Sequence, residues 1–212
     1  MKFIGITGGV GAGKSTVLEL IRQKLNAKVY RADDIAKNLM QPGTDCYDRV
    51  AECFRDEDIF ITDELLDKTQ TKPRFDDRKL AKLIFSDGSK RAKINSIVHP
   101  AVKKYIMDEV SAERERGLYD FVFFEAALLI EDGYDELCDE LWYVYANDEV
   151  RRERLKKTRN YTDEKIDGIF ASQLKDEEYR RHCRVVIDNS GSAYDLAEQI
   201  QYFGENQVTQ GR

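Results

Sequence analysis

The chain has 212 residues, of which 42% are hydrophobic and 35% are charged, and its formal net charge at pH 7 is −6. This composition is typical of a folded protein with a charged surface, and the length suits one compact α/β domain with an insertion. The acidic balance argues against a general role in binding nucleic acid or membrane surfaces.

Short apolar strands alternate with helices at both ends of the sequence. Residues 2–7 predict a buried strand, residues 14–26 an amphipathic helix and residues 28–30 a second strand. The middle of the chain has helical periodicity with little strand pattern, and the predicted helices cover residues 35–40, 46–54, 78–85, 90–98 and 101–116. We expect Pro100 to separate the last two of these helices.

The second half of the chain returns to strands. Residues 121–124 give the strongest strand pattern, and weaker patterns follow at residues 141–145 and 185–187. Helices are predicted at residues 149–157, 163–173 and 193–203. This alternation predicts a parallel sheet covered by helices on both faces, with a nucleotide site at the carboxyl ends of the strands. Within this single domain we expect a core of about 1–34 and 118–212, a helical insertion of about 35–117, and a lid of about 150–175.

The sequence also predicts the cellular location of the protein. It opens directly on the first strand, without the basic and apolar regions of an export signal. The longest apolar run is interrupted by Glu125 and has about half the length that a bilayer requires. The four cysteines form no C-x-x-C pair, so we expect reduced thiols. We therefore expect a cytoplasmic protein with no membrane or nucleic-acid partner, as a monomer or a weak homo-oligomer.

A glycine-rich loop follows the first strand. Residues 8–15 match the phosphate-loop pattern G-x-x-x-x-G-K-[ST] without a mismatch, between a predicted strand and a predicted helix. Glycines at positions 8, 11 and 13 let backbone amides approach phosphate oxygens, and the helix that follows presents its N–H groups to the same anion. The pattern therefore predicts a P-loop core that binds ATP.

Each residue type after the glycines suits a part of that task. We expect Lys14 to reach the β- and γ-phosphates, the Ser15 hydroxyl to bind Mg²⁺, and Thr16 to contact the α-phosphate. The expected cofactor-binding segment is Gly11, Ala12, Gly13, Lys14, Ser15 and Thr16. The Asn-Lys-x-Asp signature of GTPases and the Walker B Asp-Glu pair of motors are absent, which favours a small-molecule kinase.

Two further groups have candidate roles in phosphoryl transfer. Asp33 follows the second strand, where it either accepts the proton of an acceptor hydroxyl or helps to hold Mg²⁺; the alternative is that Asp33 or Asp34 caps a helix. In the basic segment from residue 149 to residue 159, Arg154 and Arg159 are the candidates for binding phosphate. A lid arginine would stabilise the charge of the transferring group and exclude water.

These features resemble the dephospho-coenzyme A kinase family, which catalyses the last step of coenzyme A biosynthesis. The resemblance runs from residue 3 to about residue 200 and includes Asp33, His99-Pro100-Ala101-Val102 and Asp188-Asn189. It rests on residues 4–16, 32–36, 41–43, 94–102, 127–131, 154–155 with Gln173, and 186–189. The His-Pro-x-Val and Asp-Asn segments are more specific than the phosphate loop.

The resemblance implies a P-loop α/β core, a helical domain for the acceptor and a lid. It implies phosphorylation of the ribose 3′-hydroxyl of dephospho-coenzyme A by ATP and Mg²⁺, with Asp33 as base, Lys14 and Arg159 as further catalytic residues, and metal binding by Ser15. Arg154 and Asn189 join the ATP-binding residues, and Thr7, Asp33 and His99 bind the acceptor.

The chain departs from the family pattern at four positions. Arg31 replaces the first Asp of Asp-Ala-Asp, and Ala127 replaces a proline. Thr158 stands at one of the two positions that could align with the lid arginine. Asp77 stands where the family often has an arginine, which here follows as Arg78. The Arg31 departure makes a magnesium site with two carboxylates doubtful. Another small-molecule kinase, such as a nucleoside monophosphate kinase, and a non-catalytic nucleotide-binding regulator are the alternative functions.

Overall fold

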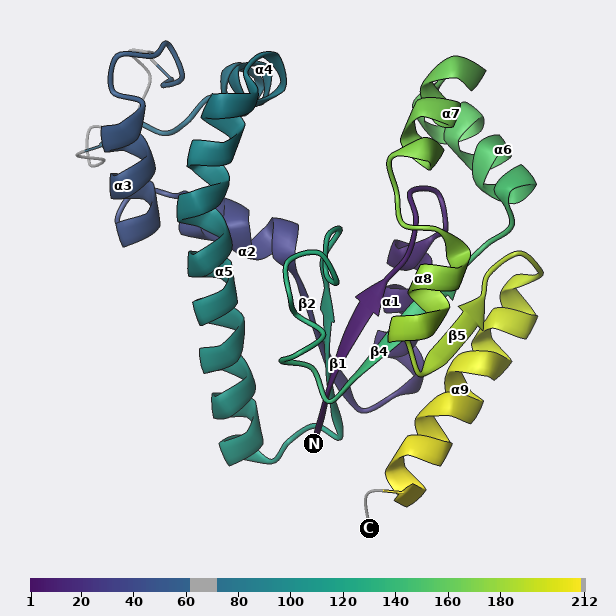
Figure 1. Cartoon of the computed structure of the whole chain (residues 1–212). Coiled ribbons are helices and arrows are strands. Elements are labelled where there is room, and N and C mark those ends of the chain that lie inside the picture. Colours follow the sequence, from purple (N-terminus) through teal and green to yellow (C-terminus); the bar gives the residue numbers. More distant parts are fainter. Residues whose placement is uncertain (62–71, 211–212) are drawn as a thin grey trace. The chain divides into compact units, whose positions relative to one another are not determined.

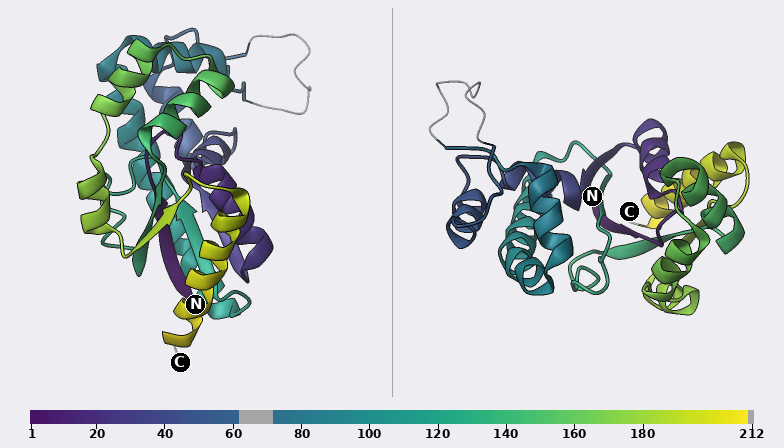
Figure 2. Two further views of the ribbon diagram at one scale, coloured as in Figure 1. Left: turned by 90° about the vertical axis from the view of Figure 1, so that its right-hand side faces the viewer. Right: turned by 90° about the horizontal axis from the view of Figure 1, so that it is seen from above.

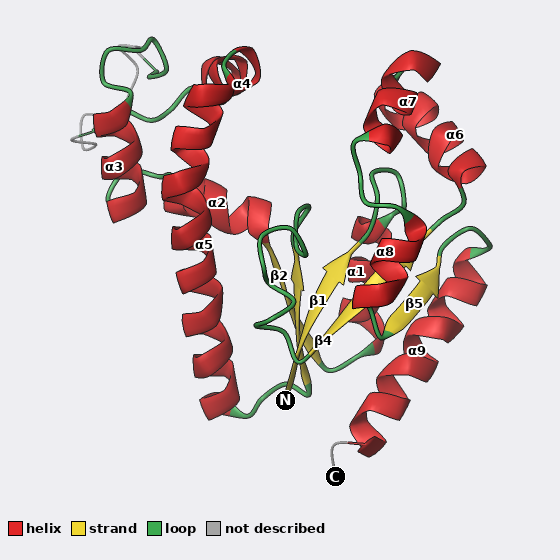
Figure 3. Cartoon of the chain, in the orientation of Figure 1, coloured by secondary structure: helices red, strands yellow, loops and turns green. Residues whose placement is uncertain are grey.

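The computed structural model describes residues 1–61 and 72–210. The chain divides into two compact units, a core unit of Met1–Arg31 with Val110–Arg212 and a helical unit of Ala32–Glu109. The core unit holds a five-stranded sheet made of β1 (Lys2–Thr7), β2 (Ala27–Arg31), β3 (Phe121–Glu125), β4 (Glu140–Tyr145) and β5 (Val185–Asp188). The strand order is β2-β3-β1-β4-β5 and all pairs are parallel, so the carboxyl ends of the strands meet at one edge (Figure 3).

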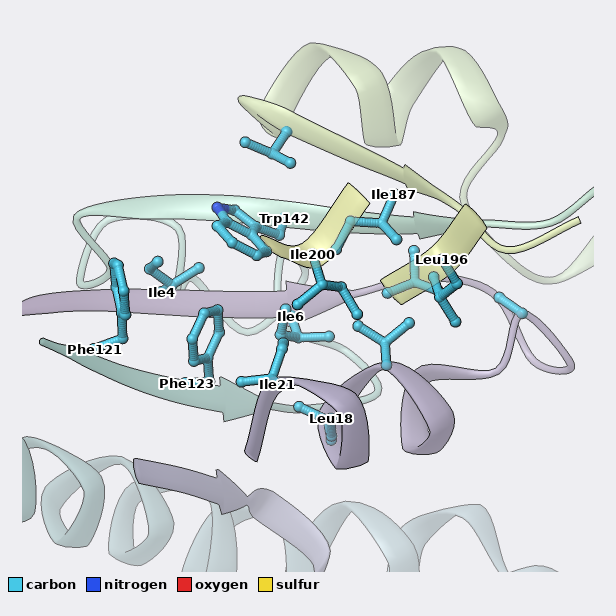
Figure 4. Packing of buried hydrophobic residues seen from close by; sticks show 14 of the residues in the cluster. Ile4, Ile6, Leu18, Ile21, Phe121, Phe123, Trp142, Ile187, Leu196 and Ile200 are labelled. Atoms are coloured by element: carbon cyan, nitrogen blue, oxygen red, sulfur yellow. The ribbon is translucent and has the colours of Figure 1, made fainter. Parts of the chain in front are cut away.

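Alternate residues of the strands face two separate packing layers. On one face, Ile4, Ile6, Phe123 and Trp142 pack against Leu18 and other apolar residues of α1 (Lys14–Lys24) and α9 (Ala193–Gln210), as Figure 4 shows. Figures 1 and 2 place α1 and α9 together on this face. Parallel strands covered on both faces read as continuous apolar runs, which explains why these strands could be predicted from the sequence.

The opposite face of the sheet is covered by aromatic side chains. The ring of Phe124 lies 4.9 Å from that of Tyr134, and Tyr143 of β4 stacks at 4.7 Å on Tyr179 of α8 (Asp176–His182). Burial raises the pKa of Tyr179 to about 12 and raises that of Tyr143 as well. These phenols therefore stay neutral in the folded core unit at ordinary pH.

The remaining helices of the core unit are α6 (Asp148–Arg159) and α7 (Asp163–Ala171). Asn147 caps α6 by accepting a hydrogen bond from the amide of Val150, and Thr162 caps α7. Arg152 of α6 forms ion pairs with Asp163 and Asp167, which join the two helices. The segment predicted as a lid thus begins with two capped helices.

The helical unit contains α2 (Ala32–Leu39), α3 (Asp45–Cys53), α4 (Asp77–Ser86) and most of α5 (Gly88–Arg116). Thr44 caps α3 and Asp76 caps α4 through short side-chain hydrogen bonds. Tyr47 packs against Phe75 with ring centroids 4.8 Å apart. Part of the predicted insertion, residues 62–71, lies outside the described residues. No helix among the described residues is long and apolar enough to cross a bilayer.

The structure differs from the sequence predictions at three of these elements. Pro100 does not end a helix, because α5 continues through it with Ile94, Val98 and Val102 buried along one face. The helix α8 was not predicted, since Tyr179 is its one buried residue and its sequence has no apolar periodicity. Helix α2 already begins at Ala32, which places Asp33 and Asp34 inside its first turn instead of at the cap.

Candidate active site

The loop between β1 and α1 has the backbone that a phosphate loop requires. Gly11 and Gly13 have φ angles of 84° and 88°, in the left-handed region that disfavours other residues. A Cβ atom at Gly13 would also lie 2.2 Å from Nδ2 of Asn189. Gly13 is the N-cap of α1, so the positive end of the helix points into the loop. The local structure is therefore that of an anion-binding loop.

The cation and the hydroxyl groups of the motif stand in the first turn of α1. The Lys14 ammonium donates a hydrogen bond of 2.6 Å to the carbonyl oxygen of Gly8, which folds the side chain back over the loop. Ser15 and Thr16 follow and are exposed, so their hydroxyl groups are open to a ligand. The structure thus gathers one ammonium and two hydroxyls beside the glycine loop.

A buried carboxylate lies beside this ammonium. Glu125 ends β3, is only 8% exposed, and has its Oε1 4.0 Å from Nζ of Lys14. Its Oε2 lies 3.6 Å from Nε of Arg31, the residue directly opposite it on β2. Glu125 was not predicted as a site residue, although an acid at the end of an apolar strand is a pattern that the sequence shows. The departure at Arg31 now has a structural consequence, because Arg31 forms an ion pair with a neighbouring carboxylate.

Arg154 and Asn189 both contact the loop backbone. The Asn189 side chain donates to the carbonyl of Ala12 at 2.7 Å, and Arg154 donates to the same carbonyl at 3.3 Å. Arg154 also donates to the carbonyl of Asn189 at 2.9 Å, which joins the two residues. The structure therefore brings both predicted residues to the phosphate loop, where both donate to the carbonyl of Ala12.

Other predicted site residues have different surroundings. Thr7, the last residue of β1, is 1% exposed and lies opposite Tyr143. Arg159 ends α6, is exposed, and places its guanidinium 5.9 Å from the ring centre of Tyr161. In the helical unit, Asp33 is exposed in the first turn of α2, and His99 is partly exposed in α5. The roles of these residues remain predictions.

The cysteines take no part in this site. All four are free thiols, and Cys183 and Cys138 lie in the core unit. Burial raises the pKa of each of these two thiols to about 12, so both stay protonated at neutral pH. A protonated buried thiol behaves as a small apolar side chain.

The parallel sheet and its glycine loop define a P-loop kinase fold. Shikimate kinase from Acinetobacter baumannii shares this fold with a TM-score of 0.55 at 15% identity, covering 98% of this chain and 96% of that one. Dephospho-CoA kinase from Campylobacter jejuni shares it with a TM-score of 0.69 at 18% identity, covering 99% of this chain and 98% of that one. Likenesses at these identities establish the fold alone.

Sequence comparison identifies the family within that class. The family model for dephospho-CoA kinase matches residues 2–195. Dephospho-CoA kinase from Bacillus licheniformis is 36% identical over 201 residues, which cover 93% of this chain and 92% of the relative. The chain belongs to the dephospho-CoA kinase family. The resemblance inferred from the sequence motifs is thereby confirmed.

Proposed function

We propose that this kinase transfers the γ-phosphoryl group of ATP to the ribose 3′-hydroxyl of dephospho-coenzyme A, giving coenzyme A and ADP. The observation that carries the proposal is the phosphate loop, with Lys14 folded over left-handed glycines, in a chain that belongs to the dephospho-CoA kinase family. A monomeric or weakly associated state and a cytoplasmic location remain predictions of the sequence.

The proposed reaction is an in-line displacement at the γ-phosphorus. The 3′-oxygen forms a bond to phosphorus, the bond from phosphorus to the β,γ-bridging oxygen breaks, and the hydroxyl proton passes to the Asp33 carboxylate. ADP leaves with the electron pair of the broken bond. Lys14 and the amides of the first α1 turn stabilise the negative charge on the phosphates, which is the main catalytic contribution in phosphoryl transfer.

The residues present fit a magnesium ion bound together with the nucleotide. Magnesium prefers oxygen ligands and retains several waters. Ser15 offers an exposed hydroxyl, and Glu125 offers a carboxylate whose recorded cationic neighbours lie 3.6 Å and 4.0 Å away. We propose that the Ser15 hydroxyl and the Glu125 carboxylate would hold the ion. The ion supplies neutralisation of phosphate charge when it is bound.

The acceptor is proposed to bind the helical unit through Asp33 and His99. This unit also contains a cavity of about 80 Å³ whose lining combines apolar and polar groups. Its lining residues are Lys37, Met40, Gln41, Phe75, Asp77 and Leu80. Ligand pockets usually measure several hundred Å³, so this cavity has room for only a few atoms of an acceptor such as the pantetheine arm.

The direct test is an ADP-release assay with ATP, Mg²⁺ and dephospho-coenzyme A, with the product identified by mass. We expect turnover with a mass gain of one phosphate on the acceptor. Adenosine monophosphate and other nucleoside monophosphates form the comparison panel, and kcat/KM for dephospho-coenzyme A should exceed theirs by orders of magnitude. Absence of turnover above background would refute the proposal.

A further inference from the structure

Both backbone groups of Val10, in the phosphate loop, are held by side chains from outside the loop. The amide of Val10 donates to Oε1 of Gln173 at 3.2 Å, and Nε of Arg151 donates to the carbonyl of Val10 at 3.0 Å. Arg151 also donates through Nη2 to the same Gln173 oxygen at 2.8 Å. Three hydrogen bonds thus join Val10, Arg151 and Gln173 in a closed network, which we call the Val10 clamp.

The arginine of the Val10 clamp is itself fixed by its surroundings. Its guanidinium lies 4.1 Å from the ring centre of Phe170 in α7, and its Nη1 pairs with Asp148 at 2.9 Å. The side chain is only 14% exposed. Because a guanidinium is planar and its donors point in fixed directions, these partners leave it one orientation. The clamp therefore connects α6 and α7 to the loop.

Gly9 explains how the guanidinium approaches so closely. Unlike Gly11 and Gly13, Gly9 is not among the glycines with positive φ, so its backbone does not exclude a side chain. A Cβ atom at this position would nevertheless lie 2.4 Å from Nη2 of Arg151 and 3.2 Å from Oε1 of Gln173. Because Gly9 has no side chain, the Arg151 guanidinium can lie against its backbone, and an alanine there would push the guanidinium away.

We infer that Arg151 and Gln173 are positioning residues, which hold the phosphate loop in its nucleotide-binding form before the nucleotide arrives. A loop rich in glycine loses much conformational freedom when it closes on phosphate. Ordering the loop in advance removes that cost from binding, which is the general benefit of preorganisation. The inference rests on the proposed function in one respect, namely that the loop binds a nucleotide; it does not depend on the acceptor.

The test measures the affinity for ADP by titration calorimetry, with no acceptor present. Arg151→Ala and Gln173→Ala should each weaken ADP binding, with about a tenfold loss for Arg151→Ala because its hydrogen bonds are charge-assisted. Lys157→Ala is the matched control, since it removes one positive charge from an exposed position of the same helix. The control should keep the ADP dissociation constant within about twofold of the wild-type value.

Gly9→Ala distinguishes positioning of the loop from a general contribution of Arg151 to stability. By displacing the guanidinium, Gly9→Ala should weaken ADP binding about as much as Arg151→Ala, and the double variant should be little worse than either single variant. The KM for ATP should rise in the same variants, whereas the KM for the acceptor should stay unchanged. Thermal unfolding without nucleotide verifies that each variant is folded, and Gln173→Ala replaces Arg151→Ala if the latter does not fold.

The outcomes separate this inference from the proposed function. Folded clamp variants that bind ADP like the wild type, or effects of Gly9→Ala and Arg151→Ala that simply multiply, would overturn it. A wild-type protein that binds ADP but does not phosphorylate dephospho-coenzyme A would contradict only the proposed acceptor. A wild-type protein that binds no ADP would overturn both.

Discussion

The two units of the molecule fix their candidate site residues in different ways. In the core unit, the loop is bound by side chains far away in sequence: Arg151 is 141 residues from Val10, and Asn189 is 177 residues from Ala12. In the helical unit, the residues proposed for the acceptor lie on two helices: Asp33 follows β2 directly in the first turn of α2, and His99 lies within α5. The nucleotide site is therefore assembled by contacts between distant segments, whereas each residue proposed for the acceptor is placed by the helix that carries it.

The largest effect is expected in the nucleotide site of the core unit, at Lys14. Lys14→Ala removes the ammonium that lies over the glycine loop, so both nucleotide binding and rate should fall. We expect a loss of about 10³-fold in kcat/KM for ATP, the upper range for one electrostatic group in a transition state. Steady-state kinetics and ADP titration measure the two parts, and unchanged kinetics would contradict the proposed phosphate site.

Asp33→Asn tests the helical unit, which carries the proposed base. An amide cannot accept the hydroxyl proton, so kcat should fall by about 10²-fold or more. The affinity for ADP should stay at the wild-type value, because the phosphate loop is intact. Titration of ADP beside single-turnover measurements separates binding from chemistry. Retained kcat would remove Asp33 as the base.

Glu125→Gln tests the buried charge at the edge of the sheet. The neutral side chain leaves Arg31 and Lys14 without their shared carboxylate, which should lower the free energy of unfolding by about 2 kcal/mol. We also expect about a tenfold lower kcat if Glu125 helps to hold magnesium. Urea unfolding and kinetics with varied Mg²⁺ provide the measurement. Glu136→Gln, at an exposed position, is the control.

Alkaline pH should destabilise the core unit through the thiols of Cys138 and Cys183. The pKa values of Cys138 and Cys183 are raised to about 12 by burial, so both stay protonated in the folded state while they ionise in the unfolded chain near their ordinary pKa. Stability is therefore fully present below that ordinary pKa and is lost as the pH rises towards 12. Between pH 7 and pH 9 we expect a loss of about 1–2 kcal/mol.

Urea unfolding at each pH measures this loss. The double variant Cys138→Ala/Cys183→Ala removes both thiols and should flatten the decline between pH 7 and pH 9. Adding salt, or Mg²⁺ without nucleotide, should not recover the lost stability, since the loss comes from burial and not from surface charge. A double variant with the same alkaline decline as the wild type would show that other groups cause it.

The sequence was most informative where the structure is locally encoded. The strand at residues 2–7 was predicted with its observed bounds, since a strand buried on both faces is a continuous apolar run. Helix α8 escaped prediction because Tyr179 is buried by stacking on Tyr143, a contact that no local periodicity reveals. Pro100 misled the prediction because the buried face of α5 continues on both sides of it. Tertiary packing prevailed over a local breaking signal there.

By itself, the sequence determined the phosphate loop, the parallel strands and the family. Those features depend on neighbouring residues: glycines that allow left-handed backbone, a lysine one step into a helix, and apolar runs. Only the tertiary structure decided that Glu125 lies between Lys14 and Arg31, and that Arg151 and Gln173 hold Val10. The physical reason is that these contacts join segments far apart in the chain. A single charged or amide side chain belongs to no periodic pattern from which its partner could be predicted.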